Sequence, residues 1–248
     1  MKEGGDAMSY DVLRNAIINH SSIVFMSGIS FTRELGIPYY TDAAEAYDVE
    51  KIYRYSPEDL FSSAFYSARP DLFYRYYRER ILHLDKEPND AYYALARLER
   101  SGKLKAIVTR SIYGIHRLAG NQNVIELYGN IHNNTCIRCG ASYPASYIKE
   151  SHGIPKCERC QGAIRPGVSF YGDMIDNGRI TAAADAIAHA DMLIIGGTHL
   201  DSYLAKRFLQ YFEGNELVLI NTEKHYSDRR ATIVVYDTLS NVLPQVIP

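Results

Sequence analysis

The chain has 248 residues, of which 27 are basic and 29 are acidic, so its formal net charge is −2. This near balance argues against a general electrostatic attraction to nucleic acid or to an acidic membrane surface. Apolar residues make up 46% of the chain and charged residues 23%, which is typical of a globular protein with a sizeable core. No apolar run reaches the roughly 18 residues of a membrane span. The first residues lack the apolar stretch of a signal peptide, so we expect a cytoplasmic protein.

Short apolar runs rich in β-branched residues alternate with segments of helical periodicity along most of the chain. The expected strands are residues 22–28, 105–109, 192–196, 216–221 and 231–235, and the expected helices are residues 89–100, 112–119, 180–190 and 202–212. Strands of this kind, separated by helices, predict an α/β fold with a doubly wound, Rossmann-like parallel sheet.

Two segments interrupt this alternation. Residues 40–84 are rich in tyrosine and helical in pattern, and residues 136–162 contain every cysteine of the chain. We therefore expect a large Rossmann-like domain made of residues 1–39, 85–135 and 163–248. The helical insertion 40–84 and the cysteine segment 136–162 are expected to form a small module.

Arginine and aromatic residues are mixed between residues 69 and 80, a composition that also occurs in nucleic-acid-binding surfaces. At helical spacing the apolar residues fall on one stripe, with the arginines on the other face. The residues of this stripe are Leu72, Phe73, Tyr76, Tyr77 and Ile81. A core helix is the favoured interpretation, and we expect no nucleic-acid partner.

The cysteines form two pairs, Cys136 with Cys139 and Cys157 with Cys160, in the spacing C-x₂-C-x₁₇-C-x₂-C. This spacing is typical of a tetrahedral zinc site. Four thiolates leave no open position for water, so the predicted zinc is structural and not catalytic. Two disulfides are the alternative, which is disfavoured because nothing marks the chain as secreted.

A series of glycine- and asparagine-containing motifs follows in a fixed order. They are Gly28-Ile29-Ser30 with residues 36–38, residues 88–96, TRSIYGIHRLAG at 109–120, VIELYGN at 124–130, RPGVSFYGD at 165–173, GTHL at 197–200, and Asn221 at a strand end. Together with the cysteine pairs, this order resembles the sirtuin family, the NAD-dependent protein deacylases, from about residue 22 to the end of the chain. Two extra residues near 31–35 either reshape the cofactor loop or lengthen a helix.

The resemblance implies a cleft for NAD and for an acylated peptide. The implied cofactor positions are Ser27, Gly28, Ile29, Ser30, Thr198 and Asn221. In the family, the segment that matches Val168, Ser169 and Phe170 pairs with the peptide as an added strand. A peptide or protein partner is therefore possible, although the segment could also be kept for packing alone. Thr198 and Asn221 could hold an adenosine or simply end their strands.

The family's catalytic histidine, the H of ELHG, is replaced by Tyr128. In the family this histidine takes a proton from the nicotinamide ribose during deacylation. A histidine with a pKa near 6.5 suits that role, whereas an ordinary tyrosine has a pKa near 10 and is ionised at about one part in a thousand at pH 7. We therefore expect Tyr128 not to act as the base.

Other family positions around the cleft are replaced as well. They are the glycine and alanine of GAG (Met26 and Ser27), the DFR triplet (Tyr39, Tyr40 and Thr41), the histidine of PNxxH (Tyr92), and the Gln, Asn and Asp of TQNID (Arg110, Ser111 and Tyr113). We expect Met26 to place bulk beside the phosphate approach. The added rings suggest a cleft partly filled by Tyr39, Tyr113 and Tyr128, which puts NAD binding in question. The alternative is that these tyrosines lie on loops and have no shared role.

From these replacements we predict a sirtuin-like protein that does not deacetylate and that serves as a peptide- or nucleotide-binding module. The alternative is a divergent NAD-consuming enzyme, either a deacylase or an ADP-ribosyltransferase, with an altered active site.

Overall fold

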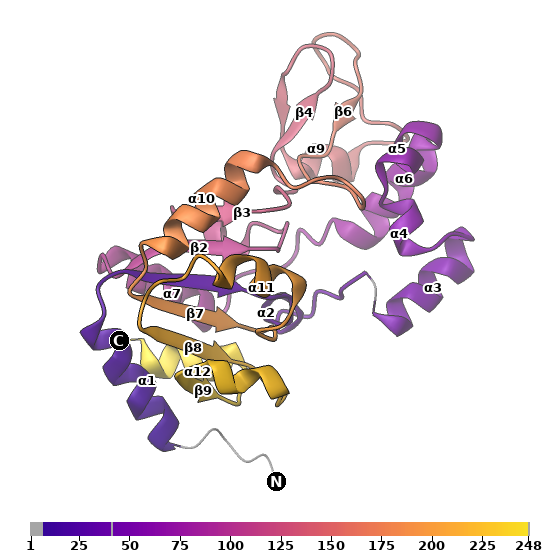
Figure 1. Ribbon diagram of the computed structural model, residues 1–248. Helices are drawn as coiled ribbons and strands as arrows, with labels where there is room; N and C mark the ends of the chain where they lie inside the picture. Colours follow the sequence, from indigo (N-terminus) through magenta and orange to yellow (C-terminus); the bar gives the residue numbers. More distant parts are fainter. Residues whose placement is uncertain (1–6, 41, 248) are drawn as a thin grey trace.

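The computed structural model describes residues 7–40 and 42–247. Thr41, at the last position of the DFR triplet, lies outside them. The centre of the fold is a six-stranded sheet in the order β3-β2-β1-β7-β8-β9 (Figure 1), and all its paired strands are parallel. The strands are β1 (Ile23–Ser27), β2 (Leu104–Thr109), β3 (Val124–Glu126), β7 (Met192–Gly196), β8 (Glu216–Ile220) and β9 (Ile233–Val235). This is the strand order of the doubly wound Rossmann fold, so the predicted fold class is confirmed.

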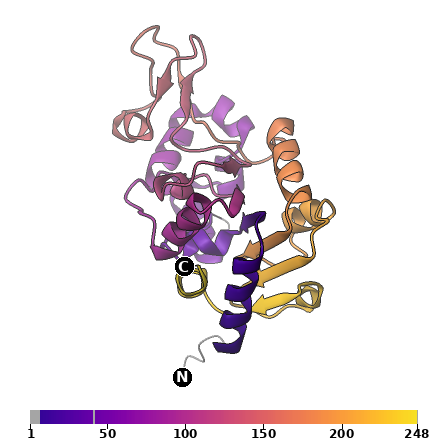
Figure 2. The same ribbon diagram turned by 90° about the vertical axis from the view of Figure 1, so that its left-hand side faces the viewer.

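Helices cover both faces of this sheet. One face carries α1 (Ala7–Asn19), α7 (Asp90–Arg100) and α12 (Leu239–Val246), and the other carries α10 (Asn177–Ala188) and α11 (Tyr203–Leu209). Figure 2 shows α12 and α10 on opposite sides of the strands. Because both faces are buried, the strands are continuous apolar runs. In residues 7–40 and 42–247 no helix is long and apolar enough to cross a membrane.

The helix predicted at residues 112–119 is shorter in the structure, where α8 spans Ile115–Leu118. Gly114 precedes it with a φ of 69°, a left-handed conformation that cannot continue a right-handed helix. The helices α1 and α12 are not among the predicted elements, although both pack on the sheet.

A second layer of structure lies beyond the carboxyl ends of the strands. It contains a three-stranded antiparallel sheet in the order β5-β4-β6. Its elements are β4 (Asn134–Cys136), β5 (Ser142–Tyr143), β6 (Ile164–Arg165), α9 (Ala145–Glu150), α3 (Ala43–Tyr53), α4 (Pro57–Leu60), α5 (Ser63–Ala68), α6 (Pro70–Tyr76) and the π-helix η1 (Tyr77–Ile81). In both ribbon views this sheet lies at the opposite end of the molecule from α1 (Figures 1 and 2).

One buried cluster joins the helices of this layer to the small sheet. Phe73, Tyr76 and Tyr77 are fully buried in it, together with Ile164 and Cys157. The predicted apolar stripe of residues 69–81 is therefore a core face, as expected.

Candidate functional site

The order in which successive strands are added to the sheet reverses between β1 and β7. The loops that leave these two strands are in direct contact. The Gly28 amide donates to the Gly196 carbonyl at 2.7 Å, and the Ser30 amide donates to the Gly197 carbonyl at 3.1 Å. A Cβ atom on Gly28 would lie 2.3 Å from the Gly197 carbonyl oxygen, so no side chain fits there. Doubly wound sheets bind their ligands at this kind of switch point.

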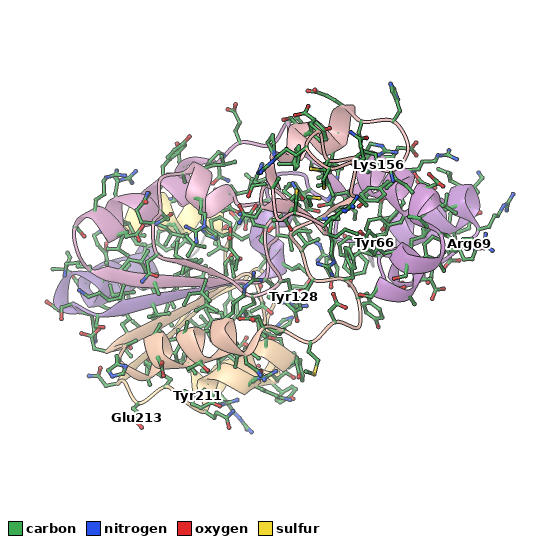
Figure 3. All side chains as sticks on the ribbon, turned by 90° about the horizontal axis from the view of Figure 1, so that it is seen from above. Tyr66, Arg69, Tyr128, Lys156, Tyr211 and Glu213 are labelled. Carbon is green, nitrogen blue, oxygen red and sulfur yellow. The ribbon has the colours of Figure 1, made fainter. Side chains whose placement is uncertain are left out.

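A cavity of about 330 Å³ opens beside this switch point. Its wall is contributed by α2 (Ile29–Arg33), by residues 37–40, by the loop after β2 and by residues 169–173. Figure 3 shows Tyr128 at the junction between the main sheet and the helical segment 43–81. The volume lies in the range of small-molecule and cofactor sites.

The tyrosines expected in the cleft do line this cavity, but they leave it open. Tyr39, Tyr113 and Tyr128 all belong to its wall. The Tyr39 ring lies 4.7 Å from the Tyr40 ring, and the Arg33 guanidinium lies 5.9 Å from the Tyr39 centroid. These three rings therefore border one cavity, and how far they reduce the space for NAD stays a prediction.

Two of the wall tyrosines are poor candidates for a base. Burial, reinforced by the Glu45 carboxylate, raises the pKa of Tyr113 above its ordinary value. Burial also raises the pKa of Tyr40, and neighbouring Tyr39 adds to this effect. Both hydroxyls therefore stay protonated at neutral pH.

Tyr128 lies two residues after the end of β3 and is held by its backbone. Its carbonyl accepts the Ser169 amide at 2.8 Å, and Gly129 forms an antiparallel bridge with Val168. Gly129 has a φ of 83°, and a Cβ there would lie 2.2 Å from the Gly167 carbonyl oxygen. The half-buried ring of Tyr128 lies 6.0 Å from the Arg110 guanidinium.

Among the described residues that line the cavity there is no histidine.

The loop after β2 brings Ser111 and Tyr113 into the same wall. The Ser111 amide donates to Thr109 Oγ1 at 3.0 Å, and the Tyr113 amide faces Ser111 Oγ at 3.4 Å. These short-range contacts form a serine/threonine turn that fixes the loop. The loop therefore presents Arg110, Ser111 and Tyr113 to the cavity together.

The predicted peptide segment also reaches the cavity. Val168 and Phe170 are buried, while Ser169 and Phe170 line the cavity wall. The Ser169 amide donates a hydrogen bond to the Tyr128 carbonyl, and the Phe170 amide donates to Asp173 Oδ2 at 2.8 Å. An added strand would have to use other backbone groups or displace these partners. Peptide binding by this segment stays a prediction.

Met26 and Tyr92 do not face the cavity, which corrects both expectations. Successive residues of a strand point to opposite faces, so Met26 follows Val24 into the buried cluster under α10 and α11 and is 2% exposed. Tyr92 is buried in the cluster on the other face, where its ring stacks on Phe31 at 3.9 Å. Neither side chain adds bulk to the cofactor approach.

The predicted cofactor positions are divided between two places. Ile29 lines the cavity, whereas Ser27 is buried and its Oγ has no hydrogen-bond partner. Thr198 and Asn221 follow β7 and β8 and do not line the cavity. The Asn221 side chain instead lies 3.3 Å from His199 Nδ1.

The residues near 31–35 complete a helix and anchor it. After α2 ends at Arg33, the Glu34 carboxylate accepts the amides of Leu239 and Ser240 at the start of α12, at 3.0 and 2.8 Å. Thr32 and Arg33 remain in the cavity wall. The segment therefore consists of the end of α2 and the turn that follows it, beside the site.

The four cysteines converge as their spacing predicts. Cys136 Sγ lies 3.5 Å from Cys160 Sγ, and Cys139 Sγ lies 3.6 Å from Cys157 Sγ. Tetrahedral ligands at a Zn–S distance of about 2.3 Å would be ~3.8 Å apart, whereas a disulfide needs about 2.05 Å. The cluster therefore fits a tetrahedral metal ion and not disulfides.

The surroundings of this cluster also suit thiolates. The Tyr143 hydroxyl donates to Cys157 Sγ at 3.1 Å and lowers the pKa of that thiol to about 6. Gly162 packs closely against the cluster. A Cβ atom at this position would lie 2.9 Å from Cys136 Sγ, so there is no room for a side chain. Four thiolate ligands complete a tetrahedral shell, which fits a structural role.

A model of the Sir2 family matches residues 27–203. The chain is 41% identical to an NAD-dependent protein deacetylase of Clostridium acetobutylicum, with 95% of this chain and 96% of the relative covered. An NAD-dependent protein deacetylase of Clostridium perfringens is also 41% identical, with 95% and 97% covered. A solved structure described as the structural basis of sirtuin substrate affinity has a TM-score of 0.84 at 27% identity, with 94% of this chain and 96% of that chain covered. A histidine-to-tyrosine mutant of Sir2 with a p53 peptide and NAD has a TM-score of 0.78 at 27% identity, with 96% of each chain covered.

Proposed function

The chain belongs to the Sir2 family, and we propose that it keeps a ligand-binding cleft of that family but does not deacetylate. One observation carries this proposal. Tyr128 occupies the position of the family's base in the wall of an open cavity, and the described lining residues include no histidine that could replace it. A positioned base typically contributes ~10²–10⁴-fold to a rate, so its loss leaves binding with little turnover.

The open cavity supports binding of a nucleotide, a peptide or both. Arg33 and Arg110 bring two guanidinium groups to the wall, and such groups favour phosphate and carboxylate. The Sir2 histidine-to-tyrosine mutant is described with a p53 peptide and NAD, which supports the idea that a tyrosine in this family is compatible with both ligands. NAD, which the replacements put in question, is therefore a reasonable ligand for this cleft.

A divergent NAD-consuming enzyme is the second candidate. Relatives with 41% identity over 95% of this chain carry the name NAD-dependent protein deacetylase. Departure of nicotinamide depends partly on how the bound ribose is positioned, so ADP-ribosyl transfer need not use a histidine. In either case the cysteine cluster would hold structural zinc, and its thiols suit a reducing compartment such as the cytoplasm.

The test is to mix the protein with NAD and an acetyl-lysine peptide, and to measure nicotinamide release and peptide deacetylation beside calorimetric binding of each ligand. The proposal expects binding of at least one ligand with deacetylation at background level. Turnover that Tyr128→Phe abolishes would overturn it and establish the enzyme. Failure of both ligands to bind would show that the cleft serves another partner.

A further inference from the structure

Two histidines and one aspartate meet at the carboxyl ends of β7 and β8. His199 lies in the loop after β7, His225 in the loop after β8, and Asp228 in the 3₁₀ helix η2 (Tyr226–Arg230). One nitrogen of each histidine and one carboxylate oxygen of Asp228 lie within 4.8 Å of one another. The two imidazole centroids are 4.6 Å apart. None of the three residues lines the 330 Å³ cavity.

Local capping explains only part of this arrangement. The His225 amide donates to Asp228 Oδ2 at 2.7 Å, and the Tyr236 hydroxyl donates to the same oxygen at 2.9 Å. Asp228 Oδ1 is buried and has no hydrogen-bond partner, although the residue is only 4% exposed. A buried carboxylate oxygen without a donor is costly, and a bound cation would satisfy it.

Further polar groups surround the two histidines. Asp201 Oδ1 lies 3.6 Å from His225 Nδ1, and Glu223 Oε2 lies 3.9 Å from His199 Nε2. The Asn221 amide faces His199 Nδ1 at 3.3 Å. Asn221 Nδ2 also donates to the Glu223 carbonyl at 3.4 Å, so this amide is held beside the His199 ring. The neighbourhood is acidic and offers second-sphere partners for the ligands.

We propose that His199, His225 and Asp228 bind a divalent transition-metal ion such as Zn²⁺, Co²⁺ or Ni²⁺, at a site separate from the four cysteines. Two imidazole nitrogens with one carboxylate are a donor set that suits these ions. Tetrahedral ligands at about 2.1 Å from a metal are ~3.4 Å apart. The donor atoms already lie within 4.8 Å of one another, so metal binding requires any pair of them to close by at most about 1.4 Å. Three protein ligands leave one position for water or an anionic ligand.

The experiment is a Co²⁺ titration of the full chain with zinc retained by the cysteines, followed by calorimetry and visible absorption. The expected result is one bound Co²⁺ per chain, with ligand-field absorption and no thiolate-to-cobalt charge-transfer band. His199→Ala and Asp228→Asn should each weaken this binding at least tenfold. His189→Ala removes an exposed histidine at the C-cap of α10 and is the matched control, which should bind Co²⁺ like the unmodified chain.

Three outcomes would overturn the proposal. The first is Co²⁺ binding that His199→Ala and Asp228→Asn leave unchanged, which would place the ion elsewhere. The second is a charge-transfer band, which would mean that cobalt had only replaced zinc on the cysteines. The third is no binding at millimolar Co²⁺. Asp228 also caps η2, so circular dichroism must show that its variant is folded, and the partly exposed His199 provides the variant that leaves the cap intact.

Discussion

The Tyr92 ring stacks on the Phe31 ring with centroids 3.9 Å apart and planes 12° apart, in the core beneath the cleft. The His116 ring packs against both, with centroids 4.7 Å from Tyr92 and 5.7 Å from Phe31. Both ring nitrogens of His116 are buried without a hydrogen-bond partner. This aromatic cluster therefore holds an imidazole that is neutral and unsatisfied.

Replacing His116 by phenylalanine should change how stability depends on pH. Burial lowers the pKa of His116 to about 3, whereas an unfolded histidine titrates near 6.5. Between these values the unfolded chain binds one more proton, so stability falls as the pH falls from 6.5 toward 3. The unmodified chain should lose about 2 kcal/mol more than His116→Phe between pH 7 and pH 5. Urea unfolding at both pH values measures this difference.

The exposed His152 supplies the control, because His152→Gln removes a histidine that lies outside the buried ring cluster. At pH 7 the His116→Phe protein should be as stable as the unmodified chain or up to about 1 kcal/mol more stable, since no unsatisfied nitrogen remains. Equal pH slopes in the two proteins would show that His116 is not held neutral.

Removing the Glu34 carboxylate should weaken the attachment of α12. Glu34 accepts two amides at the N-terminus of that helix, where negative charge and acceptors are both favourable. We expect Glu34→Ala to lower the free energy of unfolding by about 1–2 kcal/mol. Denaturant unfolding measures this free energy. Glu213 is exposed, and Glu213→Ala is the control that should be unaffected. If both variants are equally stable, the cap contributes nothing.

A methyl group at Gly28 should disturb the switch point between β1 and β7. The added Cβ would meet the Gly197 carbonyl oxygen at 2.3 Å, so the two loops must separate. We expect Gly28→Ala to cost about 1–3 kcal/mol and to weaken any nucleotide binding. Gly178→Ala in the first turn of α10 is the control, because its nearest neighbour is the end of the Asp176 side chain at 3.1 Å. An unchanged melting temperature in Gly28→Ala would contradict the close approach.

Loss of one cysteine ligand should release zinc and loosen the small sheet. Cys157→Ser removes a buried ligand that also accepts the Tyr143 hydroxyl. The chain has no tryptophan, so its near-ultraviolet circular dichroism reports mainly on tyrosines. We expect Cys157→Ser to lose the tightly held zinc and part of this signal, whereas the exposed Arg159→Ala should keep both. Retention of zinc by Cys157→Ser would refute the four-cysteine site.

Restoring a histidine at position 128 should restore proton transfer. We expect Tyr128→His to raise nicotinamide release and deacetylation by at least about 100-fold over Tyr128→Phe, the range of a positioned general base. Tyr171→His, at an exposed tyrosine of the same cavity wall, should stay at background. If Tyr128→His is no faster than Tyr128→Phe, the other replacements in the wall limit the reaction.

Local signals in the sequence predicted the elements whose pattern is self-contained. The strand over residues 192–196 matches β7 because a fully buried parallel strand is a continuous apolar run. The cysteine spacing predicted a four-thiolate cluster because each C-x₂-C turn brings two sulfurs together. The apolar stripe ending at Ile81 predicted a core face, because helical periodicity places those side chains on one side.

Side-chain direction and long-range proximity could not be obtained in this way. Met26 and Tyr92 replace residues of family motifs, yet the sheet and α7 turn both side chains into the core. His199 lies in the connection after β7, whereas His225 and Asp228 lie in the connection after β8, and these connections meet because β7 and β8 are neighbours in the sheet.

The sequence by itself determined the doubly wound α/β class, the cysteine cluster and the replacement of the family's histidine by Tyr128. These depend on residue type and on short spacings along the chain. The tertiary structure alone decided that an open cavity remains beside the predicted tyrosines and that Tyr40 and Tyr171 join its wall. It did so because the empty volume depends on how the loops after β1 and β2 and residues 169–173 pack against one another, and contacts between distant segments leave no periodic trace in the sequence.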